Sequence, residues 1–163
     1  MLHTDADLRQ GIIFGINSGV ITTAGVLAGL VQTSISPLIV IVTIVSLAIS
    51  DGLAESYGLF ISKKVEDPTD NSRGPVKSLI GLLLTKMAVV LSFLIPLLFS
   101  RKLGYFKNML WPILWGSLIL TLLDYYTSCL RKEKMMPYLV KHYILLALTL
   151  LLNIFFGRMI TKI

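Results

Sequence analysis

The sequence has little cysteine and little charge. Cys129 is the single cysteine among 163 residues, which excludes an intramolecular disulfide and a cysteine-rich metal site. Charged residues make up 15% of the chain, whereas soluble domains contain about 25%. Hydrophobic residues reach 55%, and the mean hydropathy is +0.79. This composition excludes an ordinary soluble domain.

The sequence also lacks the motifs of common enzyme classes. It has no nucleophile–base arrangement, phosphate-binding loop or dinucleotide fingerprint, so an enzyme is not expected. The net charge of +6 comes from basic residues in short segments between apolar runs, as membrane topology requires. Nucleic acid is therefore not an expected partner. No cleavable signal peptide is expected, because the N-terminal tail carries Asp5 and Asp7 and a single arginine, Arg9.

Long apolar stretches dominate the chain. Five of them are long enough to cross a hydrocarbon core about 30 Å thick, near residues 11–31, 37–62, 76–99, 107–128 and 138–160. Helices are expected because backbone groups in lipid must be satisfied within each segment, and the short alternating segments of a β-barrel are missing. The sequence predicts an all-α, multi-pass membrane protein, with residues 1–163 forming one five-helix transmembrane domain.

The distribution of Lys and Arg predicts the orientation of these spans. Nine basic residues belong to the N-terminal tail and the two loops on its side of the membrane: Arg9, Lys63, Lys64, Arg73, Lys77, Arg131, Lys132, Lys134 and Lys141. Five belong to the opposite side: Arg101, Lys102, Lys107, Arg158 and Lys162. This bias predicts a cytoplasmic N-terminus and an outer C-terminus. The host membrane is the cell membrane if the source is prokaryotic.

Two acidic residues interrupt the second span. Asp51 and Glu55 stand four residues apart, so a helix places both on one face, one turn apart. A charged side chain at the centre of a membrane helix costs about 2.5–3.5 kcal/mol on insertion scales, and such residues generally mark functional sites. The pair is therefore the first candidate site of the chain.

The tight turn between the first two spans suggests partners for these acids. Ser18 lies about 17 residues before the centre of the turn and Asp51 about 17 after it. In an antiparallel hairpin such residues meet at one depth. Asn17 and Ser18 are therefore expected beside Asp51 and Glu55, and their oxygens would suit a hard divalent cation such as Mg²⁺, Mn²⁺ or Fe²⁺. A carboxylate pair also suits proton antiport.

Lys86 stands about ten residues into the third span, where an ammonium needs a partner or a wet cavity. It either forms a fixed structural ion pair with an acid or occupies the acidic site until a metal or a proton replaces it. In the fourth span, Asp124 belongs to a polar stripe, so it is a second candidate coupling or counter-ion residue. Its alternative is pairing with Arg131 or Lys132 near water. A lone histidine such as His142 is more often interfacial than a ligand.

The first span carries two series of glycines at spacing four: Gly11, Gly15 and Gly19, then Gly25 and Gly29. Small residues at this spacing let two membrane helices approach closely. The partner is either another helix of the same subunit or the first span of a second copy. The residues alone leave both alternatives open.

Three stretches resemble the vacuolar iron transporter family. Residues 7–30 resemble its first span, where an arginine precedes Gly-x-Asn-Asp-Gly and a threonine-rich stretch ending Ala-Gly. The second span matches the family pattern Ala-Asp-x-x-Ser-Met-x-x-Gly-Glu-Tyr-x-Ser at Asp51, Gly58 and Ser62. Residues 78–99 resemble the third span, which ends in an Ile-Pro-Leu-Leu segment. The resemblance covers nearly the whole chain.

The resemblance implies a homodimeric exporter of Fe²⁺ or Mn²⁺ that exchanges metal for protons, with first-span helices of both subunits lining the pathway. It therefore favours the dimer alternative for the glycine series. Ser18 stands where the family has its first-span metal aspartate, Glu55 where it has a methionine, and Leu59 where it has a later acid. The family's long cytoplasmic insertion is a short loop here, and Lys86 has no counterpart. Glu55 would replace the missing acid, or else selectivity has changed or transport has been lost.

The sequence thus predicts a homodimeric transporter of divalent cations in the bilayer, with no permanently bound cofactor. Its predicted metal ligands are Asp51, Glu55, Asn17 and Ser18. The alternative is a protein of the same fold that does not transport, or that handles organic cations, because Lys86 neutralises Asp51 and Glu55.

Overall fold

A computed structural model of the chain describes residues 2–33, 36–66, 73–102 and 110–162. All regular structure in these ranges is helical, in the order α1 (Leu2–Leu30), α2 (Pro37–Glu66), α3 (Gly74–Ser92), α4 (Leu94–Lys102), α5 (Leu110–Arg131) and α6 (Met136–Ile160). Within the described ranges, five segments are long and apolar enough to cross a membrane: Ala6–Leu30, Pro37–Glu66, Gly74–Leu98, Leu110–Arg131 and Met136–Ile160. The predicted all-α class is confirmed for these ranges, and the five predicted apolar segments are helices long enough to be spans. Residues 107–109 of the fourth predicted span lie outside the described ranges.

Proline marks the beginning of four helices. Pro37 opens α2, Pro75 and Pro137 are the second residues of α3 and α6, and Pro112 lies in the first turn of α5. The first-turn amides of a helix have no intrahelical acceptor, so a residue without N–H costs nothing there. These prolines explain why apolar runs that are nearly continuous in sequence divide into separate helices.

A fifth proline, Pro96, has a different effect. Its ring clashes with the carbonyl of residue 92, and it offers that carbonyl no N–H. Helix α3 ends there at Ser92, Phe93 N–H donates to Val90 O at 3.2 Å in a tighter turn, and α4 begins at Leu94. The third predicted span is therefore two helices with a break at Phe93, and its apolar segment continues into α4 as far as Leu98.

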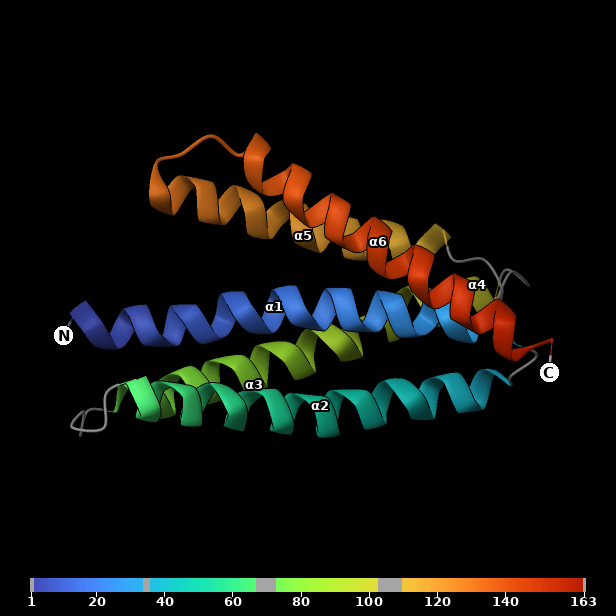
Figure 1. Cartoon of the computed structure of the whole chain (residues 1–163), viewed down its shortest axis with the longest axis horizontal. Coiled ribbons are helices and arrows are strands. Elements are labelled where there is room, and N and C mark those ends of the chain that lie inside the picture. Colours follow the sequence, from blue (N-terminus) through green and yellow to red (C-terminus); the bar gives the residue numbers. More distant parts are fainter. Residues whose placement is uncertain (1, 34–35, 67–72, 103–109, 163) are drawn as a thin grey trace.

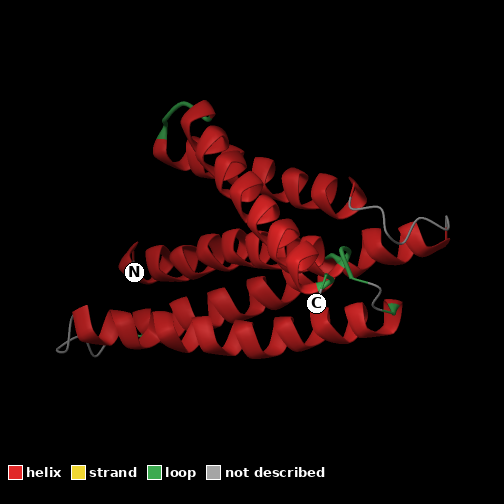
Figure 2. Cartoon of the chain, turned by 45° about the vertical axis from the view of Figure 1, so that its right-hand side comes forward, coloured by secondary structure: helices red, strands yellow, loops and turns green. Residues whose placement is uncertain are grey.

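The ends of the helices fall into two groups. Figure 1 shows the N-terminus, the end of α2, the start of α3 and the α5–α6 turn at one end, and the C-terminus with the end of α1 and the start of α2 at the other. This is the grouping that the orientation argument assumed, while the side facing the cytoplasm stays a prediction. The view of Figure 2 shows α5 and α6 as a hairpin leaning away from the other helices at the N-terminal end.

Helix α1 is the most enclosed of the spans. Its residues Val20, Ala24 and Leu27 are fully buried in a core shared with residues of every other span. The closest neighbour of α1 is α3, which also packs along α2, while α1 and α2 touch at few positions. The expectation that α2 would lie directly along α1 is wrong in this respect, because α3 occupies most of the space between them.

The glycine series explains this arrangement. A Cβ at Gly15 would lie 2.7 Å from the backbone oxygen of Leu82 in α3, closer than non-bonded atoms approach. Gly11 and Gly19 also face α3, at Ser78 and Val89. The second series faces α6, where a Cβ at Gly25 would lie 2.7 Å from the Thr149 side chain, and Gly29 lies against Asn153. In this structure all five glycines pack against helices of the same chain, which is the first of the two alternatives.

Candidate functional site

The acidic pair of α2 is joined by the lysine of α3. Lys86 Nζ lies 2.5 Å from Asp51 Oδ2 and 2.6 Å from Glu55 Oε2. Both contacts are close ion pairs. We call these residues the Lys86 triad. Lys86 thus lies beside both acids. Each of the two sequence hypotheses for this residue requires that position.

Glycines of both neighbouring helices lie beside this lysine. A Cβ at Gly19 of α1 would lie 3.6 Å from Lys86 Cγ, an ordinary contact distance. Gly52 of α2, between Asp51 and Glu55, faces Leu83 and Met87 of α3. The Lys86 side chain is therefore fully buried along its length, with 0% exposure, and its ammonium reaches α2.

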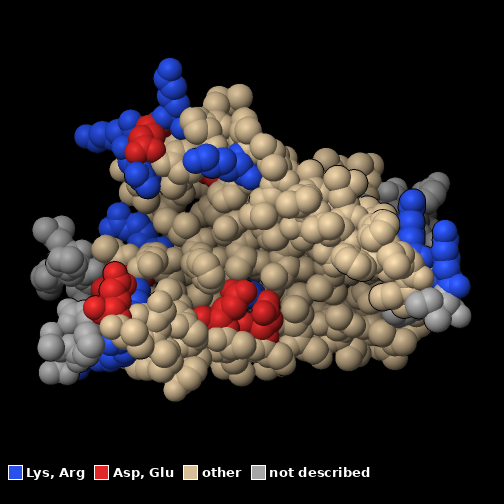
Figure 3. All heavy atoms as spheres, in the orientation of Figure 1, with Lys and Arg blue, Asp and Glu red and all other residues tan. Residues whose placement is uncertain are grey.

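The carboxylates are more accessible than the lysine. The side chains of Asp51 and Glu55 are 29% and 27% exposed. Figure 3 shows an acidic patch in the middle of one face of the molecule, away from the basic groups at both ends. The acids lie at the centre of α2, which runs from Pro37 to Glu66. The triad is thus closed toward α1 and open on the outer side of α2.

The charge of the triad is unbalanced. Two carboxylates and one ammonium carry a net charge of −1. Burying an uncompensated charge in a low-dielectric region is costly, and a buried cluster is most stable when it is neutral. The triad is therefore one proton or one monovalent cation short of neutrality. Its arrangement can accept a positive charge from the open side.

The structure separates Asn17 from these acids. Helical residues rotate by about 100° each, so Asn17 lies nearly opposite to the glycine face that contacts α3. Asn17 lines a cleft between α1, α5 and α6. Asn17 Oδ1 and Ser18 Oγ are both buried and have no hydrogen-bond partner. Neither of these oxygens therefore forms a hydrogen bond with a residue of the Lys86 triad.

Asp124 has a partner that the sequence did not identify. His142 Nδ1 lies 2.6 Å from Asp124 Oδ1, and the Asp124 side chain is 1% exposed. The alternative pairing of Asp124 with Arg131 or Lys132 is replaced in the structure by this contact. Asp124 stands nine residues before Glu133, in the α5–α6 turn, and His142 nine after it. Counting equal numbers of residues on either side of the turn, as for Ser18 and Asp51, predicts this pair.

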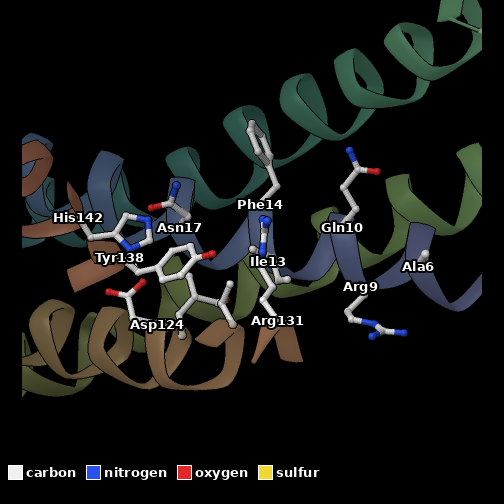
Figure 4. A pocket seen from close by; sticks show the side chains of 12 residues that line it. Ala6, Arg9, Gln10, Ile13, Phe14, Asn17, Asp124, Arg131, Tyr138 and His142 are labelled. Atoms are coloured by element: carbon white, nitrogen blue, oxygen red, sulfur yellow. Dashed lines mark hydrogen bonds and ion pairs between the residues drawn. The ribbon is translucent and has the colours of Figure 1, made fainter. Parts of the chain in front are cut away.

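A cleft lies beside Asp124 and His142. Its volume is about 740 Å³, and Figure 4 shows the residues that line it, with Asn17, Asp124, His142 and Tyr138 toward one end and Ala6 and Arg9 toward the other. Ile13, Phe14 and Leu123 supply much of its apolar lining. Asp124 Oδ2 is buried here and has no hydrogen-bond partner. We call this hollow the α1–α5–α6 cleft.

Glu133 holds two cleft residues together at the α5–α6 turn. Arg131 Nε donates to Glu133 Oε1 at 3.1 Å, and the Tyr138 hydroxyl donates to Glu133 Oε2. The hydrogen bond from Tyr138, together with the positive charge of Arg131, holds the pKa of Glu133 below its ordinary value. This carboxylate is therefore ionised at neutral pH and fixes the mouth of the cleft.

Among the described residues, no group of three or more His, Cys, Asp or Glu side chains is arranged to hold a metal ion. At the triad, a divalent cation would find two carboxylates as ligands and the Lys86 ammonium as a competing cation. Two carboxylates are fewer ligands than a closed structural metal site requires.

The fold and the triad define an all-helical protein whose five apolar spans agree with an integral membrane protein, and which carries an ion-paired acidic site at the centre of one span. Comparison with protein-family models, curated proteins and solved structures finds no match to this chain. The resemblance to the vacuolar iron transporter family therefore stays a hypothesis drawn from the sequence.

Proposed function

We propose that this chain is a membrane transporter that exports divalent cations of the Fe²⁺ or Mn²⁺ class from the cytosol in exchange for protons. The main support is the Lys86 triad, in which two partly exposed carboxylates at the centre of a span are paired with a fully buried lysine. Fixed acids at this depth are expensive, and they commonly bind cations or protons. Lys86 is the internal cation with which a substrate competes.

Charge balance gives the exchange its stoichiometry. The two carboxylates match the charge of one divalent cation, so a bound divalent cation would neutralise them. An exchange that moves no net charge returns two protons for each divalent cation.

Flux into proteoliposomes tests this proposal. Purified protein with a Mn²⁺-sensitive dye inside the vesicles is expected to pass Mn²⁺ in one direction and two protons in the other, measured with a second, pH-sensitive dye. Asp51→Asn combined with Glu55→Gln is expected to abolish both signals. Glu133→Gln, at the exposed α5–α6 turn, is the matched control and is expected to transport as the wild type does. Absence of Mn²⁺ and Fe²⁺ flux in the wild type would contradict the proposal.

A second candidate is a protein in which the triad is permanent. The observation that favours it is the complete burial of Lys86, which pairs with both acids, while the described residues hold no cluster of three metal-ligating side chains. On this hypothesis, Mn²⁺ and organic amines leave the melting temperature of the wild type unchanged. On the transport hypothesis, Mn²⁺ raises the melting temperature of the wild type and not that of the doubly substituted variant.

We also propose that the protein is a homodimer whose subunits meet along α2. Five small residues at spacing four are exposed on α2: Ser46, Ser50, Ala54, Gly58 and Ser62. A Cβ at Gly58 would meet nothing within 4 Å, in contrast to the filled glycine faces of α1. Small residues at this spacing favour close helix pairing in membranes, and a second copy would shield the neighbouring carboxylates from lipid.

Subunit counting by single-molecule photobleaching in nanodiscs tests the dimer. Gly58→Leu is expected to yield mostly monomers, because its side chain would stand between two α2 helices. The control is Leu152→Phe, which adds bulk at an exposed position of a different helix, α6, and is expected to keep the dimer. A monomeric wild type, or a Gly58→Leu variant that stays dimeric, would contradict pairing along α2.

A further inference from the structure

Two buried oxygen atoms of the α1–α5–α6 cleft have no donor. Asp124 Oδ2 and Asn17 Oδ1 are both shielded from solvent, and neither has a hydrogen-bond partner. Both residues line the cleft, from α5 and α1 respectively. His142 satisfies only the other carboxylate oxygen, Oδ1. Oδ2 therefore lacks a donor in either protonation state of His142, and buried acceptors of this kind call for a partner.

The chemistry of these acceptors selects a cation that donates hydrogen bonds. The ionised form of Asp124 is negative, and its side chain is 1% exposed. A positively charged donor is therefore a stronger hydrogen-bond partner for it than a neutral donor. A primary ammonium has three N–H donors, enough for Asp124 Oδ2, Asn17 Oδ1 and one further acceptor. A quaternary ammonium has none. The inner end of the cleft thus suits a protonated primary amine.

The other end of the cleft suits an anion. Arg131 lies seven residues after Asp124 on α5, a rise of about 10 Å. Arg131 lines the cleft from the last turn of α5. Its Nε is bonded to Glu133, while the two terminal nitrogens of a guanidinium supply further donors. Arg9 lines the same cleft from α1. A ligand with an anionic group a few ångströms from its ammonium matches both ends.

Apolar surface adjoins these polar groups. Ile13, Phe14 and Leu123 line the cleft, and a second hollow of about 320 Å³ shares Arg9, Ile13 and Leu123 with it. The remaining residues of this second hollow are Ile12, Ile16, Ile119, Leu122 and Tyr126. The cleft lies at the end of the helices where the N-terminus and the α5–α6 turn gather. In a membrane, that end meets lipid headgroups, with acyl chains beside the apolar hollow.

We propose that the α1–α5–α6 cleft binds a zwitterionic phospholipid with a primary-amine headgroup, a phosphatidylethanolamine. Its ammonium donates to Asp124 and Asn17, its phosphate accepts from Arg131 and Arg9, and an acyl chain lies along the apolar hollow between α1 and α5. This inference does not depend on the proposed transport.

Lipid retention measured by native mass spectrometry tests the site. The protein is released from nanodiscs that contain equal amounts of phosphatidylethanolamine and phosphatidylcholine with the same acyl chains. These lipids differ by the three methyl groups that remove every N–H from the ammonium. The wild type is expected to retain at least ten times more phosphatidylethanolamine. Equal retention of the two lipids would overturn the proposal.

Two variants and one control assign the effect to the cleft. Asp124→Asn is expected to abolish the preference. Arg131→Gln, at an exposed position that leaves folding intact, is expected to reduce the retention of phosphatidylethanolamine several-fold, because it removes a phosphate contact. Asp7→Asn, whose carboxylate pairs with Lys63 away from the cleft, is expected to keep both the retention and the preference. Unchanged phosphatidylethanolamine retention in Arg131→Gln would overturn the proposed phosphate contact. If free phosphoethanolamine raises the melting temperature in phosphatidylcholine nanodiscs as much as the lipid does, the ligand is a soluble amine and the lipid assignment is wrong.

Discussion

Lys86 Nζ of α3 lies 2.5 Å from Asp51 Oδ2 of α2, at the centre of a span. Glu55, one turn further along α2, contacts the same nitrogen. The lysine thereby links α3 to α2 by ion pairs, while another side of α3 packs against the glycine face of α1. One residue links the packing of three helices to the charge of the candidate site.

Removal of this lysine should destabilise the protein. Lys86→Met leaves two carboxylates without a cation. Breaking a buried pair costs about 3–5 kcal/mol, and about 3 kcal/mol is expected here because both acids are partly exposed. Thermal unfolding in detergent measures the loss. Adding Asp51→Asn and Glu55→Gln to Lys86→Met should restore most of the stability.

The matched control for this loss is an exposed ion pair. Arg131 and Glu133 are paired at 3.1 Å, with side chains that are 62% and 47% exposed. Exposed pairs contribute about 0–1 kcal/mol, so Arg131→Gln should lower stability by no more than that. A Lys86→Met variant as stable as Arg131→Gln would show that the triad contributes nothing to folding.

Two glycines of equal helical propensity should respond differently to alanine. Gly15→Ala places a Cβ 2.7 Å from Leu82 O, which forces α1 and α3 apart. Overpacking of this kind typically costs about 1–3 kcal/mol. Gly58→Ala meets nothing within 4 Å and should be neutral or stabilise α2 by up to about 1 kcal/mol. The melting temperatures of the two variants test this prediction. An unchanged melting temperature of Gly15→Ala would contradict the close α1–α3 contact.

The turn between α5 and α6 should be sensitive to acid. Because the folded-state pKa of Glu133 is lowered, its ionised form stabilises the turn above the ordinary glutamate value of 4.5, and this contribution is lost as the pH falls through the folded-state pKa. Tyr138→Phe removes the main cause. The Glu133 pKa should then rise toward 4.5, as measured by carboxyl ¹³C NMR. Tyr143→Phe is the control and should leave it unchanged.

A lysine occupies a backbone conformation that favours glycine. Lys132 has φ 55° and follows the last residue of α5, and Glu133 N–H donates to Ser128 O at 3.1 Å. This is the Schellman ending of a helix, in which the left-handed residue is usually glycine. A non-glycine residue there costs about 1–2 kcal/mol. Lys132→Gly should therefore raise the free energy of unfolding by about 1 kcal/mol, and a lower melting temperature would contradict this account.

Local sequence was enough to predict the helices and the anomalous residues. Apolar runs of sufficient length, most of them opened by a proline in the first turn, define the spans within a few residues. The cost of charge in an apolar helix singled out Asp51, Glu55, Lys86 and Asp124. The pairing of Lys86 with an acid was one of the sequence hypotheses for that residue. These features depend on composition and on neighbours within a few helical turns.

The choice of neighbours required the tertiary structure. Counting equal numbers of residues from the turn matches Asp124 with His142 and also Ser18 with Asp51, but Ser18 Oγ and Asp51 Oδ2 form no hydrogen bond, whereas Asp124 and His142 do. Helix α3 fills the space between α1 and α2 because the glycines of α1 let its backbone approach there and Lys86 reaches the acids of α2. Sequence by itself determined which segments are helical and which residues cannot face lipid. Packing, a sum of contacts between distant segments, decided which helices meet and divided the polar residues between the Lys86 triad and the α1–α5–α6 cleft.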